Sequence, residues 1–199
     1  MPHGPPLRIE TLTGAALVPL LPALARLRIA VFRDWPYLYE GDDAYEAHYL
    51  RRYAETPLGA VVVAWDGEQP VGVSTCLPLE VEPPEVTLPF RARTIPPGRV
   101  MYFGESVLLP AYRGRGAGVA FFTHRERHAL AIGRRLTAFC AVVRDRADPR
   151  RPKDAPDLAP FWKRRGYVPR PDMTCRMAWR EIGQPQETAQ TLAFWTRAL

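Results

Sequence analysis

Residues 100–119 read VMYFGESVLLPAYRGRGAGV. The apolar run at 100–109 predicts a long strand, and the glycines after it predict a tight turn that opens a helix. The first amides of a helix have no partners within it, and the helix dipole adds positive charge at that end. Because Arg113 and Arg115 also lie in the turn, residues 113–118 predict a site for a phosphate or pyrophosphate group.

Two common phosphate-binding motifs do not fit this turn. A P-loop requires a lysine directly after its last glycine, and neither lysine of the chain lies near the turn. A dinucleotide fingerprint, GxGxxG, requires glycine where Val119 stands. The spacing that is met is [Arg/Gln]-x-x-Gly-x-[Gly/Ala], with Arg113, Gly116 and Gly118.

This spacing, directly after a long strand and Pro110-Ala111-Tyr112, resembles the pyrophosphate-binding motif of the GCN5-related N-acetyltransferase (GNAT) superfamily. A second match lies at 161–167, FWKRRGY, which resembles the family's aromatic-aromatic-x-x-x-Gly-aromatic helix ending. The resemblance covers about residues 7–180 and includes the order of the elements. It implies an α/β fold with a mixed, splayed (V-shaped) sheet of about six to seven strands flanked by helices.

Periodicity and turn residues predict these elements along the chain. Strands are expected at 7–11, 60–65, 71–79, 100–109 and 136–143, with a hairpin turn at 66–70 and further strand residues at Tyr167 and at 174–179. Helices are expected at 20–31, 44–55, 118–132 and 158–165, and a proline-rich connection at 82–97.

The domain prediction is a single N-acetyltransferase domain at 1–182 followed by an extension at 183–199. In that extension Thr188, Leu192, Trp195 and Leu199 recur at helical spacing. An extra C-terminal helix is therefore expected, packed on the domain or on the partner of a possible homodimer.

The resemblance implies that acetyl-CoA is the acyl donor. Backbone groups of Ser106, Val107 and Leu108 would then bind the pantetheine arm. The pyrophosphate would be held by Arg113, Gly114, Arg115, Gly116, Ala117, Gly118 and Val119.

Glu105 is the candidate general base, because the family often places an acidic residue just before the pantetheine-binding segment. A structural or solvated glutamate is the alternative, since strand alternation could turn this side chain away. Many relatives carry a tyrosine at the position of Trp162 as the acid for the leaving thiolate. An indole cannot serve in this way, which leaves Tyr167, Tyr112 or no dedicated acid.

Residues 34–43 form an aromatic and acidic connection between two helices, where this fold usually selects its acceptor. Tyr37, Tyr39 and Glu40 are the predicted substrate contacts, because rings and carboxylates suit a cationic or aromatic amine. A loop that packs on its own core, with solvated acids, is the alternative.

The composition is typical of a folded globular protein and argues against a largely disordered chain or a coiled coil. The 199 residues are 47% hydrophobic and 24% charged, with a net charge of +6 that favours anionic ligands. Three widely spaced cysteines and the pair His124 and His128 suggest no metal site, and no nucleic-acid module is visible. Prolines and arginines interrupt the most apolar stretch, so no membrane segment is expected and a cytoplasmic location is predicted.

The function predicted from these observations is transfer of an acetyl group from acetyl-CoA to the primary amine of a small molecule by direct attack. Two alternatives stay open. One is a protein or peptide N-acetyltransferase, and the other is a CoA-binding regulator without catalytic activity.

Overall fold

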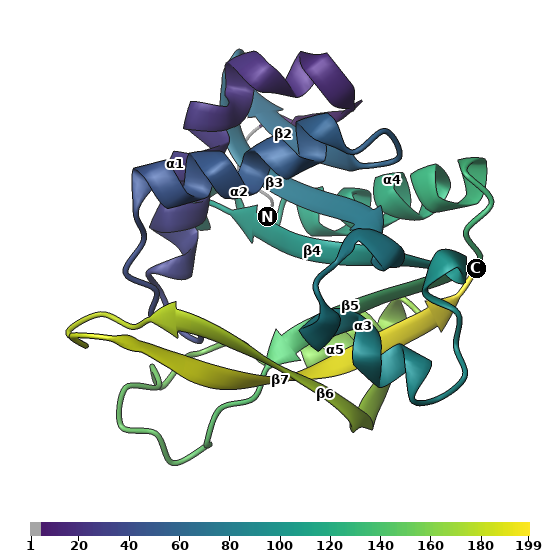
Figure 1. Ribbon diagram of the computed structural model, residues 1–199. Helices are drawn as coiled ribbons and strands as arrows, with labels where there is room; N and C mark the ends of the chain where they lie inside the picture. Colours follow the sequence, from purple (N-terminus) through teal and green to yellow (C-terminus); the bar gives the residue numbers. More distant parts are fainter. Residues whose placement is uncertain (1–4) are drawn as a thin grey trace.

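The computed structural model describes residues 5–199, which form one seven-stranded sheet with helices on both faces (Figure 1). The strand order is β1-β2-β3-β4-β5-β7-β6, and every neighbouring pair is antiparallel except β4 and β5. The strands are β1 (Arg8–Leu12), β2 (Ala60–Asp66), β3 (Gln69–Pro78), β4 (Val100–Leu108), β5 (Leu136–Val142), β6 (Val168–Arg180) and β7 (Glu187–Ala198). This mixed sheet confirms the predicted fold class.

Five α-helices cover the two faces of the sheet. They are α1 (Leu21–Phe32), α2 (Asp43–Glu55), α3 (Pro84–Arg91), α4 (Ala117–Ala131) and α5 (Ala159–Arg164). Short 3₁₀ helices are η1 (Gly14–Leu20), η2 (Leu79–Val81), η3 (Pro97–Arg99) and η4 (Pro110–Tyr112). The helix α3 lies inside the connection that the sequence predicts only as proline-rich.

Alternation along β2 shows how the two faces are built. Val61 and Val63 pack with α1 and α2, whereas Val62 and Ala64 pack with Ala117 and Phe121 of α4. Further along the sheet, α3 covers the first face and α5 the second. Both faces of the central strands are therefore buried, which explains their continuous apolar runs.

The parallel strands β4 and β5 separate soon after they pair. Only three residue pairs join them, from Val100 with Leu136 to Tyr102 with Ala138. Beyond Tyr102 the two strands diverge (Figure 1), while residues 106–108 of β4 stay paired with β3 on the other side. The predicted V-shaped opening lies between these two strands.

The predicted C-terminal helix is wrong, because residues 187–198 form strand β7. This strand lies between β5 and β6 and pairs with β6 over residues 187–196 and with β5 over residues 192–198. Its β-branched and aromatic residues suit a strand, and its helical spacing was coincidental. Leu192 and Trp195 are buried inside the domain, so no apolar stripe there calls for a dimer partner.

The apolar stretch Gly14–Phe32 is long and apolar enough, by length and composition, to cross a membrane, with a mean hydropathy of 1.8. Contrary to the expectation from the sequence, the prolines and arginines of this stretch therefore do not divide it into shorter apolar segments. Pro19 lies in η1 and Pro22 in the first turn of α1, where proline is tolerated. Leu17 and Leu24 of this stretch are fully buried in the core against the sheet.

Candidate active site

A cavity of about 850 Å³ lies where α1, α2 and α3 meet the open side of β4. The predicted base, Glu105, and the predicted substrate contacts, Tyr37, Tyr39 and Glu40, all line it. Residues of the hairpin formed by β6 and β7 form the opposite wall. The structure thus brings the predicted catalytic and acceptor residues to one cavity.

A β-bulge in β4 directs Glu105 into this cavity. Ser74 pairs with Ser106 and Cys76 with Phe103, so Thr75 faces both Gly104 and Glu105. Before the bulge Phe103 points to the face of α4, and a regular strand would send Glu105 there as well. The extra residue reverses the alternation and places Glu105 on the face of α1 and α2.

A closed set of hydrogen bonds holds the bulge. The Glu105 amide donates to Thr75 Oγ1 (3.2 Å), and Thr75 Oγ1 donates to the Tyr53 hydroxyl (3.1 Å). The Tyr53 and Tyr49 hydroxyls lie 3.0 Å apart, and Tyr49 donates to Glu105 Oε2 (3.1 Å). A Cβ on Gly104 would lie 2.6 Å from the Tyr53 hydroxyl, so the bulge requires glycine there.

Arg28 of α1 binds two buried carboxylates at the inner end of the cavity. Its Nη1 lies 2.6 Å from Glu105 Oε1, and its Nε contacts Glu46 Oε2. Burial lowers the pKa of Arg28, but Glu105 and Glu46 outweigh that effect and hold it well above its ordinary value. Burial and Glu105 raise the pKa of Tyr49, which therefore stays protonated and can donate.

Arg125 of α4 supports the bulge from the other face of the sheet. It is 2% exposed, and its Nη1 donates to the carbonyls of Thr75 (3.3 Å) and Glu105 (3.2 Å). Its Nε donates to the Phe121 carbonyl (3.2 Å), and its guanidinium lies 4.2 Å from the Phe103 ring. Burial lowers the pKa of this arginine.

Substituting Arg125 tests this support. Arg125→Met leaves three buried carbonyls without this donor, so we expect the free energy of unfolding to fall by about 1–3 kcal/mol. Urea denaturation would measure it. Arg127→Met, at an exposed position on the same helix, should change it by less than about 0.5 kcal/mol. Equal effects of the two variants would contradict this role.

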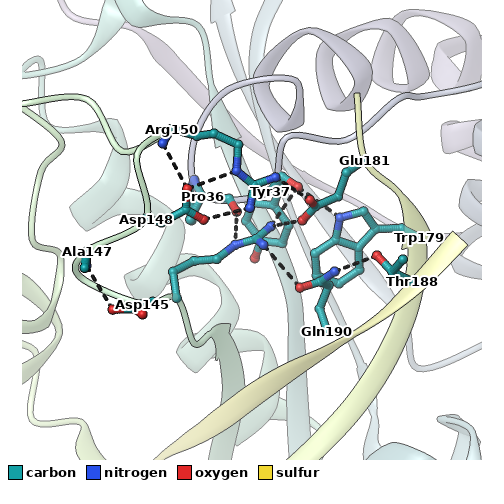
Figure 2. Close-up of polar contacts among 11 residues, drawn as sticks. Pro36, Tyr37, Asp145, Ala147, Asp148, Arg150, Trp179, Glu181, Thr188 and Gln190 are labelled. Atoms are coloured by element: carbon teal, nitrogen blue, oxygen red, sulfur yellow. Dashed lines mark hydrogen bonds and ion pairs between the residues drawn. The ribbon is translucent and has the colours of Figure 1, made fainter. Parts of the chain in front are cut away.

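Residues 34–43, which we call the acceptor loop after their predicted role, are fastened to the hairpin of β6 and β7 (Figure 2). Arg144 donates to the carbonyls of Pro36 (2.7 Å) and Tyr37 (3.1 Å) and pairs with Glu181 (2.5 Å). Arg150 pairs with the other oxygen of Glu181 at 2.6 Å. We call these contacts among Pro36, Tyr37, Arg144, Arg150 and Glu181 the loop clasp.

Backbone contacts join the same two segments. The Glu40 amide donates to the Arg180 carbonyl (2.9 Å), and the Ile182 amide donates to the Leu38 carbonyl (2.7 Å). Trp179 Nε1 donates to the Tyr37 carbonyl (2.9 Å). Tyr37 is thereby fixed at the cavity wall, between the rings of Phe32 and Trp179.

Weakening the loop clasp should loosen acceptor binding. We expect Glu181→Gln to raise KM for the acceptor about three- to tenfold with kcat nearly unchanged, since roughly 1 kcal/mol of charge pairing is lost. Steady-state kinetics would show the split, with Glu68→Gln in the distant turn of β2 and β3 as control. A fall in kcat at unchanged KM would contradict this role.

The pH dependence of the loop clasp follows from Glu181. Burial raises its pKa, but Arg150 and Arg144 outweigh that effect and hold it below the ordinary value of 4.5. Its contribution to stability is therefore complete above pH 4.5 and is lost as the pH falls through the lowered pKa.

The glycine-rich turn lies at the end of β4 and outside the cavity. Gly114 and Gly116 have φ of 78° and 85°, a left-handed conformation that favours glycine. The first helical bond of α4 joins the Ala120 amide to the Gly116 carbonyl (3.1 Å). The amides of residues 117–119 lie before this bond, in the first turn, where helix amides have no acceptor within the helix.

The predicted alternatives for the thiolate acid lie elsewhere. Trp162 packs between Phe139 and Trp195 in the core. The Tyr167 hydroxyl is engaged with Thr137 (3.0 Å), and Tyr112 lies at the glycine-rich turn, so neither lines the cavity. Tyr49 and Tyr102 do line it.

Both histidines of this pair make hydrogen bonds within the fold. His124 Nδ1 lies 2.8 Å from Thr11 Oγ1, and His128 Nε2 lies 3.0 Å from the Leu58 carbonyl. Within residues 5–199, no group of three or more His, Cys, Asp or Glu side chains could hold a metal ion.

Sequence reasoning missed Arg28, Glu46, Tyr49 and Arg125. Their signal was a polar or charged residue on the apolar face of a helix, as with Arg28 beside the buried Leu24 and Leu27. Such a residue is seldom buried unless it is paired, and this pattern alone does not name its partner.

Comparison with known proteins supports the predicted family. The sequence model of the acetyltransferase (GNAT) family matches residues 24–150. A search of curated proteins finds no match. Two of the similar solved structures are a ribosomal-protein-alanine N-acetyltransferase from Brucella melitensis and a GCN5-related N-acetyltransferase from Kribbella flavida.

The likeness to these structures concerns the fold. The Brucella protein is 16% identical with a TM-score of 0.62, covering 97% of this chain and 100% of its own. The Kribbella protein is 18% identical with a TM-score of 0.60, covering 97% of this chain and 98% of its own. Because the family model matches residues 24–150, more than half of the present chain, this chain belongs to the GNAT family of N-acetyltransferases.

Proposed function

We propose that this chain transfers the acetyl group of acetyl-CoA to the primary amine of a small molecule, with Glu105 as the general base. The observation that carries the proposal is the position of Glu105 on the wall of an acidic and aromatic cavity where β4 and β5 separate. Three reduced, buried cysteines agree with action in the cytoplasm.

Residues of β4 and α4 fit acetyl-CoA. Beyond Tyr102, the edge of β4 that faces β5 has no strand partner, so backbone groups of Ser106, Val107 and Leu108 could pair with an extended pantetheine arm. The amides of residues 117–119 and the cations of Arg113 and Arg115 suit a pyrophosphate. When bound, acetyl-CoA supplies an activated acetyl thioester.

Gly118 provides a specific test of this fit. Its Cβ would meet only Phe161 Cζ at 3.6 Å, an ordinary contact, and its φ is not positive. The fold therefore accepts a Cβ there, in agreement with the glycine or alanine that the motif allows at this position.

We accordingly expect Gly118→Asp to leave stability nearly unchanged, because an acidic side chain suits the first turn of a helix. Its negative charge would repel a bound pyrophosphate, so CoA affinity should fall at least about tenfold, or 1.4 kcal/mol. Thermal denaturation and calorimetry would measure the two effects. Unchanged CoA affinity would contradict the assignment of the pyrophosphate to this helix start.

The proton balance gives Glu105 its role. An ammonium acceptor and a thioester yield an amide, a free thiol and one proton, so the nitrogen must lose a proton before it attacks. Glu105 accepts that proton, and Arg28 and the Tyr49 hydroxyl hold its carboxylate in place. The neutral amine then forms the C–N bond as the C–S bond breaks, and the second proton that the nitrogen loses goes to the departing thiolate, which becomes the free thiol.

The loop clasp favours a small acceptor over a peptide. A peptide groove at this wall would need a gap between the acceptor loop and the β6–β7 hairpin, and backbone hydrogen bonds join these segments instead. The Brucella neighbour is described as acting on alanine of a ribosomal protein, so a peptide acceptor is the second candidate.

A free-thiol release assay tests the proposal. The chain is incubated with acetyl-CoA and polyamines, aliphatic amines, arylamines, amino acids, aminoglycosides or short peptides. Turnover with a small amine is expected. Turnover with peptides alone would favour the second candidate, and CoA binding without any turnover would favour a non-catalytic regulator.

A further inference from the structure

The inner end of the cavity holds one carboxylate more than its arginine can neutralise. Glu46 and Glu105 both contact Arg28, and these residues are 0%, 8% and 7% exposed. A further buried cation, Arg125, binds the Glu105 carbonyl from the other face of the sheet. On the cavity side the two carboxylates and Arg28 leave a net negative charge, and a buried charge without a counterion is unfavourable. On this side the cluster therefore lacks one cation.

Glu46 also keeps an oxygen that is not fully satisfied. Its Oε2 contacts Arg28, and burial together with an interaction with Glu46 raises the pKa of the Tyr39 hydroxyl, but Glu46 Oε1 accepts no hydrogen bond of good geometry from residues 5–199. Glu46 is fully buried and lines the cavity. Because a buried acceptor without a donor is unfavourable, this atom indicates a hydrogen-bond donor that arrives with a ligand.

The rest of the cavity also favours a positively charged ligand. Seven carboxylates and four guanidiniums line it, although the whole chain carries a net charge of +6. The Tyr39 ring also lines the cavity, and aromatic faces attract cations, as the Arg28 guanidinium 4.2 Å from the Tyr49 ring shows within the site. The charges and the aromatic rings of the cavity therefore both favour a cation as the ligand.

We propose that Glu46 binds the acceptor and that the site takes the acceptor up as an ammonium cation. This deepens the proposed acetyl transfer and rests on it. The ammonium donates to Glu46 Oε1 and supplies the missing charge, and Glu105 then removes its proton. Aliphatic amines, with a pKa of about 10.4 as in lysine, are cations at neutral pH, so the site selects them over neutral arylamines.

Calorimetry on the unmodified chain tests this without turnover. Phenethylamine and its neutral isostere 2-phenylethanol are titrated into the chain with CoA present. We expect the amine to bind at least about tenfold more tightly, with no proton released when buffers of different ionisation enthalpy are compared. Equal affinities, or release of one proton per amine bound, would overturn the proposal.

The variant Glu46→Gln tests the named residue. Arg28 and Glu105 remain a neutral pair, so the fold should persist, which a thermal midpoint would verify. We expect amine affinity to fall about tenfold, 2-phenylethanol binding to stay constant, and KM for the amine to rise more than kcat falls. The matched control is Glu55→Gln, at an exposed position of the same helix.

The possible failures can be told apart. If Glu46→Gln binds amines like the unmodified chain, the role of Glu46 is wrong even where acetylation occurs. If no amine is acetylated, the proposed function fails, while the two isosteres still decide whether the cavity binds a cation. If Glu46→Gln does not fold, the comparison of isosteres on the unmodified chain decides the proposal.

Discussion

Replacing Glu105 by glutamine is expected to lower kcat/KM for acetyl transfer by about 10²–10⁴-fold, the usual contribution of a general base. Glutamine keeps the shape of the side chain: its carbonyl oxygen can accept from Arg28, and its amide group can donate to the Tyr49 hydroxyl. It cannot accept a proton from the ammonium. Thiol release under saturating acetyl-CoA would measure the loss.

The same change should leave stability nearly untouched, which separates catalysis from folding. In the unmodified chain Arg28 faces two carboxylates, and Glu105→Gln leaves a one-to-one pair with Glu46. We therefore expect the free energy of unfolding to change by less than about 1 kcal/mol. Glu55→Gln serves as control for the rate. A variant as active as the control would remove Glu105 as the base.

The largest expected effect on stability comes from Arg28. The change Arg28→Leu leaves Glu46 and Glu105 buried side by side without a cation. Removing one partner of a buried ion pair typically lowers the free energy of unfolding by about 3–5 kcal/mol. Urea denaturation of the variant beside the unmodified chain would measure this loss.

The loss in Arg28→Leu should depend on pH. With no cation nearby, burial and like charge raise the pKa of the carboxyl groups in the folded variant. The folded variant then binds protons more readily than the unfolded chain, so its stability rises as the pH falls. We expect a larger deficit at pH 8 than at pH 5, and recovery of part of it by the additional change Glu46→Gln. A deficit independent of pH would show that lost packing, and not charge, is the cause.

The sequence alone was enough to predict six of the seven strands, because these strands and the turns beside them carry local signals. The turn at 66–70 and the glycine-rich turn at 113–118 each have residues that only certain backbone conformations accept. Strand β7 was missed since its residues fit both periods, and only the vacant place between β5 and β6 selects the strand.

The candidate site was predictable only in part. Glu105 and Tyr37 could be named from the family motif and from the composition of a loop. The direction of Glu105 depends on the bulge, which forms because Thr75, Tyr53 and Arg125 bind its backbone or surround it. Those contacts join residues 20–50 positions apart, and no local pattern contains them.

Strand β7 also sets an order for folding during synthesis. Until residues 187–198 have been made, β5 and β6 each present an edge without a partner, and such edges invite association with other chains. Translation proceeds at about 5–20 residues per second, so these strand edges stay unpaired for seconds. The first half of the sheet, β1 to β4, can pair in that time, whereas the half that holds the loop clasp waits for the last strand.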